Sequence, residues 1–146
     1  MNYEFTIRGV VNMSFQLSIF VPDKRFLEIS AQEIIFSTPE GRFGVMAGHM
    51  PMVVSVVEDV IDIQQDGQWK SAAVSQGFAE ISGDSVSFFV GTAEWADEID
   101  TVRAKEALER AEIRLQSELS RKEYLRTKTA VARAMARLKA AKSIKH

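Results

Sequence analysis

Every residue type that interrupts helices is confined to the first two thirds of this chain. All eight Gly and all three Pro precede Trp95, and none follows it. Because Gly and Pro favour turns and disfavour helix interiors, the first part is expected to form short strands joined by turns, and the rest uninterrupted helix. The 146 residues include 46% hydrophobic residues and no Cys, which excludes a disordered chain and a disulfide scaffold.

The formal net charge of −2 conceals a segregation of charge along the chain. Residues 1–96 hold 5 Lys and Arg against 12 Asp and Glu, whereas residues 97–146 hold 13 against 8. An acidic segment is therefore joined to a basic one. No run approaches the ~18 apolar residues of a membrane span, and residues 1–12 lack the apolar core of a signal peptide, so a cytosolic chain is expected.

Short apolar stretches in the first part are separated by turn residues at the spacing of a sandwich or barrel. Residues 14–21 alternate apolar and polar side chains. Asp66 and Gly67 form a dipeptide that tolerates the positive φ angles of a type I′ hairpin turn. These patterns predict an antiparallel β-sandwich. Its strands are expected at residues 14–21, 32–37, 42–46, 52–57, 60–65, 68–74, 78–81 and 85–90.

The period changes to that of an α-helix beyond residue 97, with Asp97 or Asp100 as a candidate N-cap. A polar stretch, residues 116–123, is expected to contain a turn. The fold class is therefore α+β, a sandwich followed by an antiparallel two-helix hairpin. Narrow apolar stripes make such a hairpin marginal alone, so it is expected to dock movably. The first stripe comprises Ala104, Leu108, Ala111 and Leu115, and the second comprises Tyr124, Val131, Met135 and Leu138.

Catalytic constellations are not expected. The chain has no Cys and two His, His49 and His146, which excludes a Cys–His dyad and a Cys/His metal cluster. No Gly-x-Ser-x-Gly or Walker-type loop occurs, and the glycines of residues 41–48 are better explained by turns. Neither catalytic nor metal-binding residues are therefore assigned.

Arginines form aligned stripes on both predicted helices. At 100° per residue, the arginines of each helix fall within about 40° of one another and away from its apolar stripe. The bland interpretation is a solvated, salt-bridged face. The alternatives are a polyanion site, because guanidinium forks suit phosphate oxygens, or docking on an acidic protein surface. The stripes comprise Arg103, Arg110 and Arg114 on the first helix and Arg126, Arg133 and Arg137 on the second.

Two sequence stretches carry a family resemblance. Residues 38–51, TPEGRFGVMAGHMP, are similar to Glu-Gly-x-x-Gly-Ile-x-Pro-Gly-His-x-Pro, and residues 75–81, SQGFAEI, are similar to Ser-Gly-Gly-x-x-Glu-Val. With the predicted architecture, they resemble the ε subunit of the bacterial F-type ATP synthase. The resemblance implies a non-catalytic central-stalk subunit on the cytoplasmic face of the cell membrane, in contact with the γ subunit, the membrane rotor ring and the catalytic α/β head.

A third stretch resembles the ε subunits that bind ATP. Residues 99–104, IDTVRA, fit the motif Ile/Leu-Asp-x-x-Arg-Ala, and Glu94 stands at the position of a further contributing glutamate. Asp100 is equally well explained as a helix cap. The resemblance implies a regulatory ATP site and no metal cluster. Its residues are Glu94, Ile99, Asp100, Arg103, Ala104, Arg110, Arg126, Arg133 and Arg137.

The chain departs from the family pattern at several positions. Arg42 stands where many members carry an acidic residue facing the rotor ring, and Gln76 replaces a Gly, so it is expected to take an ordinary φ. Ala47 replaces a Pro. We expect Arg42 and His49 to lie at the ring and γ side of the sandwich. Residues 1–12 precede the usual family start and are assigned as an extension, followed by the sandwich at 13–96 and the hairpin at 97–146.

The resemblance implies a two-state switch. An extended hairpin would block ATP hydrolysis by the catalytic head, and bound ATP would favour the compact hairpin. The alternative is an autonomous module that binds polyanions or nucleic acid through the basic hairpin. Stacking on single strands needs aromatics among the basic residues, and Tyr124 alone follows Trp95, opposite the arginines. Nucleic acid is therefore not an expected partner.

Overall fold

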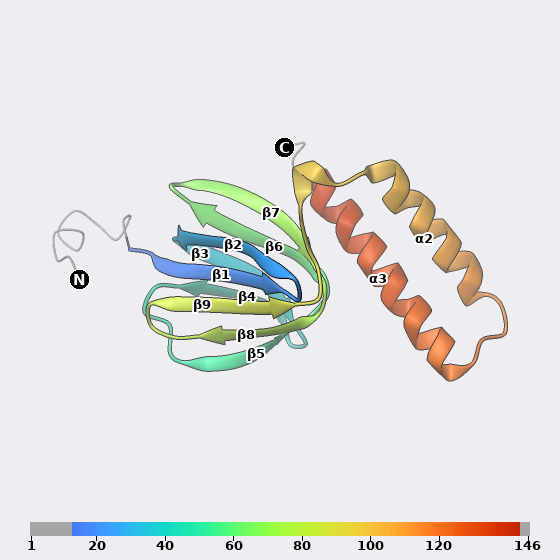
Figure 1. The fold of residues 1–146 in the computed structure, drawn as a ribbon, viewed down its shortest axis with the longest axis horizontal. Coiled ribbons are helices and arrows are strands. Elements are labelled where there is room, and N and C mark those ends of the chain that lie inside the picture. The colour runs from blue at the N-terminus through green and yellow to red at the C-terminus, as the bar shows by residue number, and fades with distance from the viewer. Residues whose placement is uncertain (1–12, 144–146) are drawn as a thin grey trace.

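A computed structural model describes residues 13–143 as a two-layered β-sandwich followed by a helical hairpin (Figure 1). The fold class agrees with the sequence prediction. The assigned extension, residues 1–12, and the terminal His146 lie outside the described residues. The strands are β1 Phe15–Val21, β2 Lys24–Ala31, β3 Glu33–Thr38, β4 Gly41–Met46, β5 Met52–Val56, β6 Asp59–Gln65, β7 Gln68–Val74, β8 Gly77–Ile81, β9 Ser85–Val90 and β10 Ala93–Trp95.

The strands form two five-stranded sheets. Sheet A has the order β2-β1-β9-β8-β5, and sheet B has the order β10-β7-β6-β3-β4. The neighbours pair antiparallel as expected, except that β1 runs parallel to β9. This pairing joins the first strand to a strand distant in sequence, which local patterns do not reveal.

Two strands, β2 and β10, were not predicted from the sequence. In β2, charged and apolar side chains do not alternate regularly, and β10 is three residues long. The β6–β7 turn matches its prediction, because Asp66 has φ 53° and Gly67 has φ 77°. Gln76 is absent from the non-glycine residues with positive φ in the described chain, so it takes the ordinary φ expected of it.

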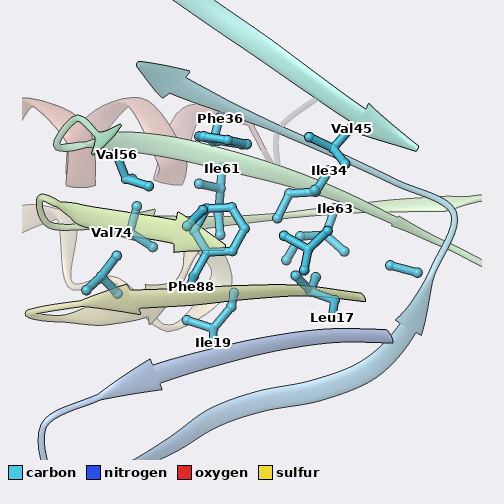
Figure 2. Close-up of a cluster of buried hydrophobic side chains, with 14 of the residues drawn as sticks. Leu17, Ile19, Ile34, Phe36, Val45, Val56, Ile61, Ile63, Val74 and Phe88 are labelled. Atoms are coloured by element: carbon cyan, nitrogen blue, oxygen red, sulfur yellow. The ribbon is translucent and has the colours of Figure 1, made fainter. Parts of the chain in front are cut away.

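Alternate residues of both sheets fill the space between them with apolar side chains (Figure 2). Phe36 of sheet B and Phe88 of sheet A meet edge to face with ring centroids 4.9 Å apart. Complete burial of such large side chains is the main driving force for folding the sandwich. The largest buried side chains are Phe36, Phe88, Leu17, Ile19, Ile34, Ile61, Ile63, Val45 and Val86.

The C-terminal part is helical from residue 96 onward. A short 3-10 helix, η1 Ala96–Glu98, precedes α2 Thr101–Leu115 and α3 Arg121–Ser143. Ser120 and Glu123 form a capping box, in which the hydroxyl accepts from the Glu123 amide and the carboxylate accepts from the Ser120 amide. This box starts α3 inside the stretch in which a turn was expected.

The helices pack through alanines more than through the larger apolar residues. On α2, Ala104 and Ala111 are buried as predicted, and α2 packs against α3. On α3 the predicted stripe is wrong in part, because Tyr124 is 44% and Met135 55% exposed. Small side chains let α3 approach two neighbours at once, so the buried residues are Thr127, Ala134, Ala136, Ala140 and Ala141.

The hairpin is docked on the sandwich through α3, which packs against β6, β7 and η1 (Figure 1). The contact contains Val60 of β6, Ala73 of β7 and Ala140 of α3, together with Ala96, Ile99 and Ala141. Four of these six residues are alanines, so the apolar contact is thin compared with the sandwich core. Ion pairs between α3 and the sandwich surround this contact.

Candidate functional site

Three ion pairs surround the contact between α3 and the sandwich. Arg137 donates from Nε and a terminal nitrogen to the two carboxylate oxygens of Glu94, at 2.7 and 3.2 Å. Arg133 Nε donates to Glu58 Oε2 at 3.0 Å. Lys139 Nζ donates to Asp59 Oδ1 at 3.0 Å. The acidic sandwich and the basic hairpin seen in the sequence are thus complementary at their interface.

Glu58 lies between β5 and β6, and its side chain is only 8% exposed. Burial raises the pKa of Glu58 above its ordinary value, and the hydrogen bond and charge of Arg133 oppose that rise without cancelling it. The ion pair therefore only partly compensates the desolvation of this carboxylate.

Asp59 has the opposite balance. Burial tends to raise the pKa of Asp59, but hydrogen bonds from the Ser37 hydroxyl, the Val60 amide and Lys139 outweigh burial and hold that pKa below its ordinary value. The Ser37 and Val60 bonds measure 2.5 and 2.8 Å. The pKa values of these adjacent carboxylates thus shift in opposite directions, because desolvation dominates at Glu58 and hydrogen bonds dominate at Asp59.

A pocket of about 180 Å³ lies beside these ion pairs. Its walls include the carboxylates of Glu58 and Glu94, the guanidinium-bearing Arg133 and Arg137, and Thr92. The structure therefore brings together three residues of the predicted ATP site, namely Glu94, Arg133 and Arg137. In this arrangement both arginines are bound to carboxylates of the chain itself.

The motif at residues 99–104 has a structural role in this conformation. Asp100 caps α2 by accepting the Arg103 amide at Oδ1, 3.1 Å away. Ile99 is buried in the contact beneath α3, and Ala104 is completely buried. Arg103 is exposed at its side chain. Arg103 is thus the cationic residue of the motif, and its exposed side chain is available to an anionic ligand.

Helix geometry places the five arginines of the predicted ATP site on one face of the hairpin. Arg103 and Arg110 are seven residues apart on α2, and Arg126, Arg133 and Arg137 share one side of α3. The opposite face is a groove lined by Lys105 and Lys142, among others. When two helices pack antiparallel, the residues that directly precede the contact residues of each helix project to the same side of the pair. The alignment inferred from the sequence therefore extends across both helices.

The two predicted partner-binding residues lie on or next to β4, which forms an edge of sheet B. The Arg42 guanidinium donates to Ser37 Oγ at 3.0 Å, to the Val60 carbonyl at 2.7 Å and to Asp62 at 3.0 Å. The His49 ring meets Phe43 edge to face, with centroids 5.5 Å apart. Arg42 is thus hydrogen-bonded within the sandwich while its side chain stays partly exposed.

Sequence reasoning missed three residues of this interface, Glu58, Asp59 and Lys139. The available signal was the pair of adjacent acids between two predicted strands, since carboxylates at that position need a cationic partner when another element covers them. Which helix would supply the cation depends on packing. Among the described residues, no group of three or more His, Cys, Asp or Glu is placed to hold a metal ion, and no helix is long and apolar enough to cross a membrane.

A β-sandwich followed by a basic helical hairpin defines a class of protein. Comparison of the chain with known protein families identifies that class. The family model described as ATP synthase, Delta/Epsilon chain, beta-sandwich domain matches residues 14–96. The family model described as ATP synthase, Delta/Epsilon chain, long alpha-helix domain matches residues 97–142. The chain belongs to the ATP synthase delta/epsilon chain family. It is accordingly a non-catalytic subunit, as the resemblance implied.

Relatives support the ε type. An ATP synthase epsilon chain of Ruminiclostridium cellulolyticum is 46% identical over 127 residues, which cover 87% of this chain and 95% of the relative. One of Caldanaerobacter subterraneus is 38% identical over 132 residues, covering 90% and 96%. A chain in the mitochondrial ATP synthase of Euglena gracilis has the same fold, with a TM-score of 0.78, 23% identity and coverage of 94% of this chain and 85% of its own.

Proposed function

We propose that this ε-type subunit belongs to the central stalk of a bacterial ATP synthase and that ATP regulates its hairpin. The sandwich would contact the γ subunit and the membrane rotor ring, which places the subunit peripherally at the cytoplasmic face of the membrane. The hairpin, when extended, would reach the catalytic α/β head and inhibit ATP hydrolysis. The family assignment argues against the alternative of an autonomous polyanion-binding module.

The observation that carries the nucleotide proposal is the common face of the arginines on a compact, docked hairpin. Arg103 and Arg110 on α2 would contact phosphate oxygens together with Arg126, Arg133 and Arg137 on α3. A ligand that bridges both helices binds only when the helices lie side by side, so it favours the compact hairpin by its differential affinity. ATP is thus proposed as a signal and not as a substrate.

Binding requires a rearrangement at the interface. The pocket of about 180 Å³ is smaller than the roughly 300 Å³ of small ligand sites, so the nucleotide would have to enlarge it. Phosphate oxygens would replace the carboxylates of Glu58 and Glu94 as partners of the Arg133 and Arg137 guanidinium groups. Glu94 would then be available to a ligand hydroxyl or amino group, which suits the contribution that the resemblance assigns to it.

Calorimetric titration of the full chain with ATP and ADP tests this proposal. Arg103→Ala is expected to weaken ATP binding about tenfold or more, as for loss of a charge-assisted hydrogen bond. Lys105→Ala is the matched control, because Lys105 lies on the same helix but lines the opposite groove. An absence of heat with millimolar ATP, or equal losses in the two variants, would contradict the nucleotide site and leave the stalk assignment intact.

The inhibitory role is tested in the assembled ATP synthase. Deleting residues 97–146 is expected to increase ATP hydrolysis if the hairpin restrains the head. ATP added to the intact complex is expected to relieve inhibition less when Arg103 is replaced. Unchanged hydrolysis after the deletion would remove inhibition from the proposal without affecting calorimetric ATP binding.

The sandwich carries a candidate surface for its stalk partner on the outer side of sheet A. Phe20, Phe89 and Phe78 stack in a row across β1, β9 and β8, with ring centroids 5.2 and 5.0 Å apart. Phe78 is 44% exposed. Exposed aromatic rows are typical of protein interfaces, and we propose that this row contacts the γ subunit. Phe78→Ser should weaken co-purification with γ while leaving ATP binding unchanged.

A further inference from the structure

One carboxylate, that of Asp59, connects the hairpin to an edge of the sandwich. Its Oδ1 atom accepts from Lys139 Nζ at 3.0 Å and from the Val60 amide at 2.8 Å. Its Oδ2 atom accepts from the Ser37 hydroxyl at 2.5 Å and lies 3.7 Å from a terminal nitrogen of Arg42. A carboxylate offers about four acceptor positions, and this one uses three of them in hydrogen bonds and also makes an ion pair with Arg42.

The two cations at this carboxylate come from elements that do not otherwise pair. Lys139 belongs to α3 of the movable hairpin, whereas Arg42 belongs to β4 at the edge of sheet B. Arg42 also donates to Ser37 and to Asp62. Its side chain is 38% exposed, so a partner can reach the guanidinium from solvent.

We propose that Arg42 and Lys139 compete electrostatically for Asp59, so that an acidic group of a partner that draws Arg42 away tightens docking of the hairpin. The competition follows from charge, because two cations share one anion and repel each other. Two of the hydrogen bonds that orient Asp59 do not come from Arg42, since the Ser37 hydroxyl and the Val60 amide hold one oxygen each. Removing Arg42 therefore strengthens the attraction of Lys139 and leaves Asp59 with both of these hydrogen bonds.

This coupling goes beyond the nucleotide proposal, because it links a surface of the sandwich to the hairpin without any ligand between the helices. Its chemical requirement is a partner carboxylate at the exposed side of Arg42. Contact at β4 would then shift the equilibrium between docked and undocked hairpins. The direction is fixed by the charges: neutralising Arg42 favours docking.

A buried thiol measures docking directly, because the chain has no Cys of its own. Ala140 is completely buried between α3 and the sandwich, so a thiol in Ala140→Cys reacts with a disulfide reagent when the hairpin undocks. Ala141→Cys, in the same contact, is a second probe in case the first disturbs packing. Ala79→Cys, completely buried in sheet A, reports unfolding of the sandwich alone.

The expected result is slower labelling of the hairpin thiol in Arg42→Gln, by roughly two- to fivefold at low salt, the size of an exposed charge–charge effect. Lys139→Met should accelerate labelling by a similar factor. High salt should shrink both differences. In the Asp59→Asn background, Arg42→Gln should slow labelling less, because only the direct repulsion between Arg42 and Lys139 is left to relieve.

The matched control is Arg25→Gln, which removes one exposed positive charge from β2 of the other sheet. It should leave labelling at residue 140 unchanged. An unchanged or faster rate in Arg42→Gln, with the Ala79→Cys probe unaffected, overturns the proposal. An equal slowing in the Asp59→Asn background also overturns it, because the effect would then not pass through Asp59.

Discussion

Arg137 of the hairpin holds both carboxylate oxygens of Glu94 at the end of the sandwich, with Nε–Oε1 2.7 Å and a second bond of 3.2 Å. A guanidinium fork matches a carboxylate in a way that an ammonium group does not. We therefore expect Arg137→Lys to weaken docking of the hairpin on the sandwich by about 1 kcal/mol, although the positive charge is kept. Hydrogen exchange of α3 amides against urea measures this change.

Arg110→Lys is the control for that prediction, because Arg110 is exposed on α2. It should leave protection of α3 unchanged within about 0.5 kcal/mol. Equal protection in Arg137→Lys and the natural chain would show that the second hydrogen bond adds nothing to docking.

Acid should affect the two adjacent interface carboxylates in opposite directions. Asp59 has a lowered pKa, so its contribution to stability is present above its unfolded pKa and lost as the pH falls through the folded value. Glu58 has a raised pKa, so its contribution is greatest in acid and lost as the pH rises through the folded value. Asp59→Asn should flatten the acid loss of stability, and Glu58→Gln should steepen it.

Urea unfolding at a series of pH values from acid to neutral measures the two slopes. Stability at a single pH does not test this prediction, because each variant also loses a hydrogen bond. The same slope in both variants would mean that their surroundings do not distinguish the two carboxylates.

Asp100 offers a test of capping against ligand binding. Asp100→Ala should destabilise α2 by about 1 kcal/mol, because the Arg103 amide loses its acceptor. Asp100→Asn keeps an N-cap acceptor and should preserve helix stability. If Asn also preserves ATP affinity in calorimetry, the aspartate charge has no role at the nucleotide; if affinity falls while circular dichroism is unchanged, Asp100 contacts the ligand.

Gly77 is required by close approach of backbone in sheet A. A Cβ atom at this position would lie 1.9 Å from the Phe89 carbonyl oxygen. Gly77→Ala should therefore destabilise the sandwich by about 2–4 kcal/mol, since the strands must move apart. Gly83→Ala is the control, because nothing lies within 4 Å of its added Cβ. Thermal unfolding should separate the two variants clearly.

Local patterns in the sequence were sufficient for much of the architecture. Apolar stretches bounded by turn residues predicted β7 and β9 with their observed bounds, and Asp66-Gly67 predicted its turn, because strand ends and hairpin turns depend on neighbouring residues. The Arg103 position on an exposed helix face also followed from periodicity. By contrast, β2 and β10 were missed, since their stability comes from pairing with β1 and β7 rather than from their own pattern.

The sequence by itself determined the division into an acidic, turn-rich sandwich and a basic, helical hairpin, because Gly, Pro and charge act locally or add along the chain. Only the tertiary structure decided that Glu94 meets Arg137, that Asp59 lies between Lys139 and Arg42, and that alanines form the contact beneath α3. Those choices depend on how closely α3 approaches the sandwich, and that distance is set by packing between segments far apart in sequence.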